Sequence, residues 1–349
     1  MEKVPTRPSK NVEQEQDAVV EEEVETNSVV THLAKKYLAV EELDLTPRWR
    51  NWLTRCQSGL LLMSAFYAIV VWGPPGLILL TYVGSSYCYH EVMSLGCQVT
   101  RSSDMTTWSW LLFVLVNLYL FDPAVFTSLP VSTWWQEPLC YSLYLCLIVW
   151  FVLSIRHTSQ CLQKYCLLAW AHMAVFFICI QAHLLNETIR HGLIWYVFSM
   201  TIITLNDIMA YMSGFFLGST PLIILSPKKT WEGFIGGGIT TILVGPIYGY
   251  YLLQVPHLVC PTSDLQVMAC DPESLPFYPH FLHHCAVISL FASTVGPVAG
   301  FFCSGFKRAC DKKNFGSLIP GHGGVMDRCD CMYLMASFTY IYLKYVVFL

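Results

Sequence analysis

Long apolar runs separated by short polar segments most constrain what this chain can fold into. A run of about 18 or more apolar residues is long enough to cross a bilayer as a helix. Only 13% of the residues are charged and 54% are hydrophobic, whereas soluble proteins average about 25% charged residues. The sequence therefore predicts an all-α polytopic membrane protein with about nine transmembrane helices. The expected spans are 57–73, 75–93, 107–125, 139–155, 165–185, 192–217, 233–254, 285–303 and 331–349.

The distribution of cations predicts the orientation of these spans. If the N-terminus is cytosolic and every span crosses, 18 of the 20 Lys and Arg residues fall in cytosolic segments. The exceptions are Arg190, in a luminal loop, and Lys344, inside the last span. The luminal segment 255–284 contains neither Lys nor Arg. Cytoplasmic loops of membrane proteins carry an excess of these residues, so we expect a cytosolic N-terminus.

The segments outside the spans carry weaker signals. Residues 1–45 include an acidic run without a packable apolar face, which predicts a disordered cytosolic tail. The net charge of −4 argues against a nucleic-acid partner. Cys260 and Cys270 would face an oxidising lumen, where they either pair or remain as thiols. Asn186 begins a glycosylation sequon, but its closeness to the membrane disfavours modification.

Residues 304–330 carry the densest mixture of charge and glycine in the chain. Cations come first, then the run Pro-Gly-His-Gly-Gly at 320–324, and finally Asp327 and Asp330. The N–H groups of a glycine turn can face an anion, and carboxylates three residues apart share one face if a helix starts there. Carboxylates beside a basic patch suit Mg²⁺ bound to a nucleotide. The alternative is a solvated cytosolic loop with a glycine turn.

A second group of polar residues surrounds the sixth expected span. Asp207 lies within an apolar run, where a charge costs roughly 2.5–3.5 kcal/mol and is expected to face a partner or a wet cavity. A structural pairing with a buried Arg or Lys is the alternative. Ser226 and Pro227 then indicate a helix start, at which Lys228 and Lys229 either hold phosphates or simply anchor the span on its cytosolic side.

These motifs resemble the signature of the phosphatidate cytidylyltransferases, or CDP-diacylglycerol synthases, in their animal-type form. The blocks Asn-Asp-Ile-Met-Ala-Tyr at 206–211 and Leu-Ser-Pro-Lys-Lys-Thr-Trp-Glu-Gly-Phe-Ile-Gly-Gly at 225–237 resemble the same family. His90-Glu91 also fits its pattern. Asn314 and Ser219 depart from it, because the family usually has Asp and a basic residue there, which suggests a divergent paralogue. The matching signature positions are Ser304, Lys307, Arg308, Lys313, Gly316, Pro320, His322, Gly323, Gly324, Asp327, Arg328 and Asp330.

The resemblance implies an activity and a role for each residue. Members of the family join CTP and phosphatidic acid to give CDP-diacylglycerol and pyrophosphate, for phosphatidylinositol and other phospholipid synthesis at the endoplasmic reticulum membrane. It implies a transmembrane cytidylyltransferase domain over residues 46–349, Mg²⁺ held by Asp207, Asp327 and Asp330, and suggests a homodimer. The expected phosphate-binding residues are Lys228, Lys229, Lys307, Arg308 and His322, and further substrate contacts are expected from Ser304, Lys313, Gly323, Gly324 and Arg328.

Three other functions fit parts of the pattern. A pseudoenzyme of the same fold would bind lipid or nucleotide without turnover. A transporter with a basic cytosolic mouth would move substrate without CTP, although a transport site is expected near the bilayer midplane. A CTP-dependent lipid kinase would leave no cytidine in its lipid product.

Two substitutions test the expected metal site. Asp327→Asn should abolish Mg²⁺-dependent formation of CDP-diacylglycerol from labelled CTP and phosphatidate. Asn314→Asp should raise it or leave it unchanged, because it restores the usual carboxylate. Undiminished product from the Asp327 variant would contradict the metal assignment.

Overall fold

The computed structural model describes residues 47–100, 105–121, 134–263, 265–319 and 323–348. The expected tail at 1–45 and the candidate residue His322 lie outside these ranges. The chain divides into one unit with residues 1–61 and 318–322 and a second with residues 62–317 and 323–349. Both hydrophobic clusters and the charged groups described below belong to the second unit.

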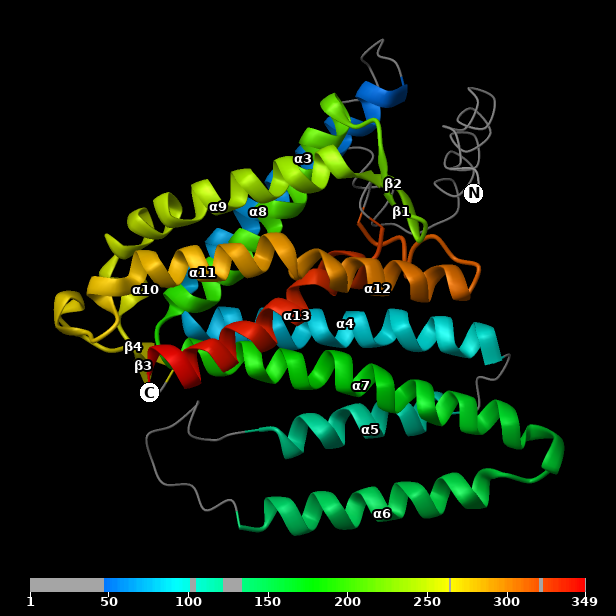
Figure 1. Ribbon diagram of the computed structural model, residues 1–349. Coiled ribbons are helices and arrows are strands. Elements are labelled where there is room, and N and C mark those ends of the chain that lie inside the picture. Colours follow the sequence, from blue (N-terminus) through cyan, green and yellow to red (C-terminus); the bar gives the residue numbers. More distant parts are fainter. Residues whose placement is uncertain (1–46, 101–104, 122–133, 264, 320–322, 349) are drawn as a thin grey trace. The chain divides into compact units, whose positions relative to one another are not determined.

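Helices make up most of the described chain (Figure 1). The first two are separated at Gly73, whose φ of +94° is accessible to glycine, as the Gly-Pro-Pro sequence predicts. The helices are α3 (Pro47–Trp72), α4 (Pro74–Thr100), α5 (Thr106–Tyr119), α6 (Gln136–Ser154), α7 (Cys161–Ile189), α8 (Leu193–Leu217), α9 (Trp231–Leu253), α10 (Pro256–Val259), α11 (Phe281–Thr294), α12 (Gly296–Ala309) and α13 (Met326–Tyr342). Shorter 3₁₀ segments are η2 (Thr158–Gln160), η3 (Pro272–Ser274) and η4 (Tyr278–His280), and the last turn, η5 (Leu343–Val347), is a π-helix.

Five helical segments of the described chain are long and apolar enough to cross a membrane. They are Trp52–Trp72, Gln136–Ser154, Thr158–Ile189, Leu193–Leu217 and Tyr278–Ala309. The expected spans 75–93 and 233–254 do form helices, α4 and α9, but their glycines, tyrosines and polar residues leave them outside this group. The structure thus supports a helical protein with several membrane-crossing segments, and nine spans with a cytosolic N-terminus remains a prediction.

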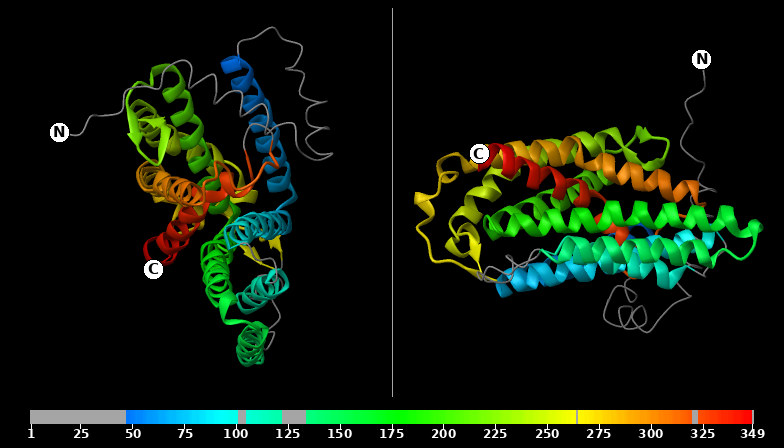
Figure 2. Two further views of the ribbon diagram at one scale, coloured as in Figure 1. Left: turned by 90° about the vertical axis from the view of Figure 1, so that its right-hand side faces the viewer. Right: turned by 90° about the horizontal axis from the view of Figure 1, so that it is seen from below.

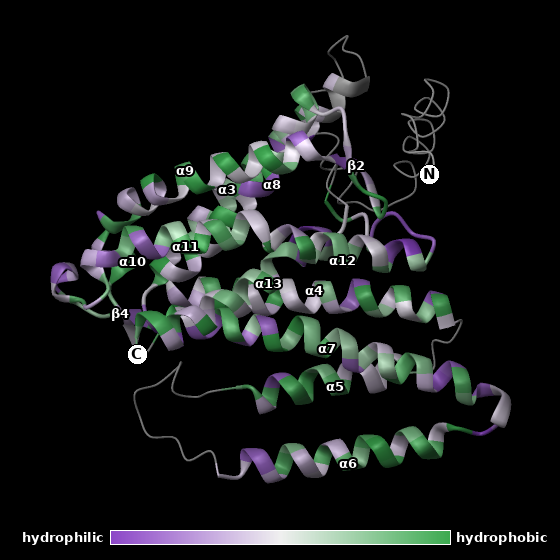
Figure 3. Cartoon of the chain, in the orientation of Figure 1, coloured by the Kyte–Doolittle hydropathy of each residue, from purple (hydrophilic) through white to green (hydrophobic). Residues whose placement is uncertain are grey.

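Two hydrophobic clusters hold the helices of the second unit together. The first surrounds the N-terminal half of α8, where residues 193–198 are buried against α4, α9, α11 and α13. The second lies between α4, α5, α6 and α7, and α12 and α13 add residues to it. In the end-on view of Figure 2, the axes of α4, α5, α6 and α7 run close to parallel. Hydrophobic residues also cover outward faces of α6 and α7, as expected of helices in contact with lipid (Figure 3).

Four short strands interrupt the helical pattern. β1 (Pro221–Ile223) and β2 (Ser226–Thr230) pair antiparallel, with Pro221 opposite Thr230. The expected helix start at Ser226 is therefore wrong: α9 begins at Trp231, where the Thr230 hydroxyl accepts a hydrogen bond from the Gly233 N–H at 3.1 Å. Residues 304–309, expected in a loop, instead form the last turns of α12.

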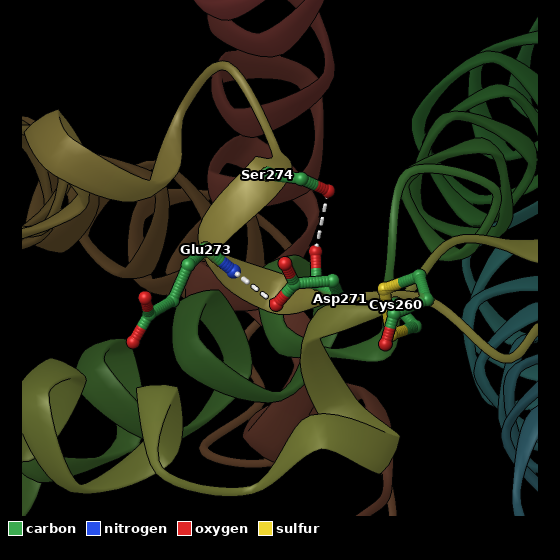
Figure 4. The surroundings of a disulfide bond; sticks show 5 residues. Cys260, Asp271, Glu273 and Ser274 are labelled. Carbon is green, nitrogen blue, oxygen red and sulfur yellow. Dashed lines mark hydrogen bonds between the residues drawn. A yellow bond between two sulfur atoms is a disulfide. The ribbon is translucent and has the colours of Figure 1, made fainter.

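The segment between α9 and α11 contains a disulfide, which decides between the two alternatives left open for its cysteines. Cys260 and Cys270 are bonded (Figure 4). They flank the small hairpin of β3 (Thr262–Ser263) and β4 (Gln266–Val267). Beside the bond, the Asp271 carboxylate accepts a hydrogen bond from the Glu273 N–H at 3.3 Å. The sequon residue Asn186 is buried within α7, so its amide is inaccessible for glycosylation.

Helices α8 and α9 approach each other closely because glycines line the contact. A methyl group at Gly237 would lie 2.8 Å from the backbone nitrogen of Ala210 and 2.9 Å from its Cα atom. Backbone cannot move aside as a flexible side chain can. At the next position, Gly238, a methyl group would meet only the Cβ atom of Ser293, at 3.7 Å.

We therefore expect opposite effects from two neighbouring glycine-to-alanine changes. Gly237→Ala should destabilise the protein by about 1–3 kcal/mol, the usual cost of overpacking. Gly238→Ala should be neutral or stabilise by about 0.5–1 kcal/mol, because alanine is the better helix former. Thermal unfolding in detergent micelles measures both, and equal midpoints for the two variants would contradict the close packing of α8 on α9.

Candidate active site

The end of α12 and the start of α13 bring together the first charged group. Lys307 Nζ donates to Asp327 Oδ1 at 2.5 Å. The other carboxylate oxygen of Asp327 accepts from the N–H groups of Phe315 at 2.9 Å and Gly324 at 3.0 Å. Only 8% of Lys307 and 6% of Asp327 is exposed. This buried pair fixes the segment that connects the two helices.

Gly323 completes the turn beside this pair. Its φ of +83° lies in the region that favours glycine. A methyl group there would lie 3.0 Å from Asp327 Oδ2 and 3.3 Å from the side-chain Cγ of Asn314. Asn314, the departure from the family pattern, therefore lies at the exposed edge of the Asp327 group.

Glu91, on α4, caps the start of α13. Its Oε1 accepts from the Val325 N–H at 2.9 Å and its Oε2 from the Met326 N–H at 2.8 Å. Negative charge is favourable at a helix N-terminus, where N–H groups lack intrahelical partners. Gly316 and Gly324 pack against the carboxylate so closely that a side chain at either position would collide with it. Glu91 thereby attaches the signature segment to α4.

A second charged group lies one helical turn along α13. Asp330 is half-buried, and Asp207 of α8 is close enough for the two carboxylates to repel. Burial, followed by the charge of Asp207, raises the pKa of Asp330, which precedes the last expected span, to about 6. A methyl group at Gly300 of α12 would lie 3.5 Å from Lys229 Nζ and 3.8 Å from Asp330 Oδ2. Glycine at this position therefore leaves room for both side chains.

The two charged groups are neighbours. Asp327 and Asp330 are one turn apart on α13, and the charge of Lys307 also acts on Asp330. Among the described residues, no three His, Cys, Asp or Glu side chains are arranged to hold a metal ion together. The pair Asp207 and Asp330 is nevertheless suited to Mg²⁺, which is commonly held by one or two carboxylates together with substrate phosphates.

The other candidate residues lie at the surface or serve the local structure. Lys228, Arg308, Lys313 and Arg328 are exposed. Arg308 donates to the Lys312 carbonyl at 3.0 Å, and the Ser304 hydroxyl donates to the Gly300 carbonyl at 2.7 Å within α12. The structure therefore brings Asp207, Lys229 and Asp330 together, and separately Lys307, Gly323, Gly324 and Asp327.

Ser219, the second departure from the family pattern, has a defined partner. Its hydroxyl donates to Glu232 Oε1 at 2.7 Å, and its N–H donates to Oε2 at 3.1 Å. The hydroxyl and N–H of Thr220 donate to the same carboxylate. Hydrogen bonds from Thr220 and then Ser219 hold the pKa of Glu232 well below its usual range. Ser219 thus fastens the end of α8 to the start of α9.

From the sequence, Glu91 stands out only as part of a pattern that matches the family, without a role of its own. The signal that identified Asp207 was present here too, since Glu91 is a carboxylate within an expected span. Its partners could not be identified, because they are backbone N–H groups more than two hundred residues away.

The cap predicts a specific loss of stability. Glu91→Ala leaves the N–H groups of Val325 and Met326 without their acceptor, and we expect a loss of about 1.5–3 kcal/mol, typical of hydrogen bonds to a charged group. Glu137→Ala, which removes an exposed carboxylate from the first turn of α6, should cost less than about 1 kcal/mol. Thermal unfolding in detergent compares the two, and similar losses would contradict the assigned cap.

Comparisons with known proteins identify the family of this chain. The model of the cytidylyltransferase family matches residues 53–346. The chain is 38% identical to phosphatidate cytidylyltransferase 1 of Homo sapiens over 338 residues, covering 86% of this chain and 73% of that protein. It is 36% identical to phosphatidate cytidylyltransferase 2 of Homo sapiens over 339 residues (86% and 76%) and to the phosphatidate cytidylyltransferase of Caenorhabditis elegans over 338 residues (86% and 72%). This chain therefore belongs to the cytidylyltransferase family.

Proposed function

We propose that this protein is an active CTP:phosphatidate cytidylyltransferase, which makes CDP-diacylglycerol and pyrophosphate. The observation that carries the proposal is the group of Asp207, Lys229 and Asp330, contributed by three separate elements next to apolar helices. Lysine and carboxylates side by side suit a metal-bound triphosphate meeting a lipid phosphate. Neither a pseudoenzyme nor a transporter is favoured, because the chain's relatives are cytidylyltransferases over most of their length.

The reaction needs no nucleophile from the protein. A phosphate oxygen of phosphatidate attacks the α-phosphorus of CTP, a P–O bond forms there, and the bond to the β-phosphate breaks. Pyrophosphate leaves with that electron pair. The task of the protein is to hold two anions together and to stabilise the charge that develops between them.

The side chains divide this task according to their surroundings. Lys229 is half-buried beside Asp330 and faces the phosphates, and the exposed Lys228 and Arg308 draw CTP to the site. Lys307 is committed to Asp327, so the pair acts mainly by fixing the glycine turn and its N–H groups. His322, which lies outside the described residues, is proposed as a hydrogen-bond donor to phosphate on the family resemblance alone.

We propose Mg²⁺ as the cofactor, with Asp207 and Asp330 as its principal ligands. Bound there, the ion would neutralise the triphosphate and polarise the reacting phosphate. Asp327, the third ligand expected from the sequence, already accepts three hydrogen bonds. Its contribution to the ion therefore depends on its remaining lone pairs, and its main role is to position Lys307.

The cellular setting follows from the family resemblance. We propose a multi-pass protein of the endoplasmic reticulum membrane that forms a homodimer and has its charged site on the cytosolic face. The apolar helices support the membrane location, and the cation distribution supports the orientation.

Two aspartate-to-asparagine changes separate chemistry from structure. Asp330→Asn should lower CDP-diacylglycerol formation about 100-fold or more without lowering the unfolding midpoint, because it removes charge that only the ion and phosphates need. Asp327→Asn should also destabilise the protein, by about 3–5 kcal/mol, since it leaves Lys307 buried without its partner. The assay uses labelled CTP, phosphatidate and Mg²⁺, beside thermal unfolding of each variant.

Asp311→Asn serves as the matched control. Asp311 is exposed and adopts a φ of +55°, which asparagine tolerates well, so neither activity nor stability should change. Full activity in Asp330→Asn would contradict the metal assignment. Wild-type protein that forms no cytidine-containing lipid would contradict the proposed function.

A further inference from the structure

An apolar cavity of about 270 Å³ lies between α4, α7, α12 and α13. It is lined almost entirely by hydrophobic side chains, and the carboxylate-bearing residue in its wall is Asp330. A cavity of about 150 Å³ already accommodates benzene, so this one has room for a run of several methylene groups. Figure 1 shows the four helices adjoining.

The outer end of the cavity opens on a lipid-facing surface. Phe177 of α7 and Val298 and Phe302 of α12 line it and are 38%, 51% and 53% exposed. The rings of Phe177 and Phe302 are 5.3 Å apart, with their planes tilted by 31°. Both helices belong to segments apolar enough to cross a membrane, Thr158–Ile189 and Tyr278–Ala309. A lipid tail in the bilayer therefore has direct access to this end.

The inner end reaches the charged site. Asp330 and Phe315 line it there, and Lys307 Nζ lies 5.2 Å from the centre of the Phe315 ring. On the side of Asp330 that faces Gly300 lies Lys229. The same cavity thus borders Asp330 and the exposed residues Phe177, Val298 and Phe302.

We propose that this cavity holds the glycerol-proximal methylenes of one acyl chain of phosphatidate, with the attached phosphate directed at Lys229 and Asp330. The proposal rests on the proposed function, because it names where the lipid substrate of that reaction lies. An apolar tail matches the lining of the cavity, and an anionic head beside Asp330 would have its charge balanced by the neighbouring Lys229 and by the ion proposed above. Since the bilayer interior is as apolar as the cavity wall, binding the acyl chain there adds little affinity. Its main effect is to position the phosphate for reaction.

Filling the cavity tests the proposal. Ala299 lines it, so Ala299→Phe should lower kcat/KM for phosphatidate about tenfold or more by displacing the acyl chain, while KM for CTP stays within about twofold. Val298→Trp narrows the exposed rim and serves as a second variant if Ala299→Phe fails to fold. Ala169→Phe is the matched control, because Ala169 is exposed on α7 and does not line the cavity.

Photolabelling gives a readout that does not need turnover. Phosphatidate with a diazirine near the glycerol end of one chain, in phosphatidylcholine vesicles, should label the part of the cavity lining next to Asp330, such as Phe315 and Met326. Ala299→Phe should reduce that labelling and Ala169→Phe should not. If the enzyme is active but both cavity variants keep kcat/KM and labelling unchanged, the cavity assignment is wrong and the proposed function stands.

The opposite result is equally distinct. A wild-type protein that makes no CDP-diacylglycerol but is labelled at the cavity would overturn the proposed function and leave the lipid site in place. Absence of both product and cavity labelling would overturn both.

Discussion

Burial of charge among apolar helices is the constraint on which this structure depends. A carboxylate buried among these helices needs hydrogen-bond donors or a cation, because the free-energy cost of an unpaired buried charge exceeds the typical free energy of folding. Asp327 finds Lys307 and two backbone N–H groups, and Glu91 finds the first N–H groups of α13. These two carboxylates join α4, α12 and α13 into one frame.

Asp330 is compensated less fully: its carboxylate accepts a hydrogen bond from the Cys331 N–H at 2.8 Å, yet burial and the charge of Asp207 still raise its pKa. Asp330 and Asp207 lie close enough to repel each other, and the cations whose charge acts on Asp330 include Lys307 and Arg328. Lys229, on β2, lies near Asp330 beside Gly300. The paired carboxylates Asp327 and Glu91 stabilise the helix arrangement. Asp207 and Asp330 are compensated less fully and can bind a cation. Asp327 and Asp330, one turn apart on α13, therefore have different roles: the first mainly structural, the second proposed for catalysis.

The approximate positions of the long helices could be predicted from sequence, because apolar runs depend on local composition. Gly73 separates α3 from α4, and α8 ends at Leu217, where the sixth span was expected to end. The β1–β2 hairpin was not predicted, because Ser226 and Pro227 are compatible with both a helix start and a strand. The pairing with residues 221–223 favours the strand. The pairing of Lys307 with Asp327, the cap by Glu91 and the cavity above Asp330 all depend on how distant helices pack, which residue spacing does not encode.

The exposed side of the cavity, between α7 and α12, determines which concentration of the lipid substrate controls its occupancy. A tail that enters sideways from the bilayer is drawn from a two-dimensional pool, so occupancy follows the number of suitable molecules per area of membrane and not their amount in water. Diluting phosphatidate with inert lipid would then lower the turnover rate even when the total amount of phosphatidate is constant. Phe177 and Phe302, whose rings are exposed and lie 5.3 Å apart, mark the place where such a tail would enter.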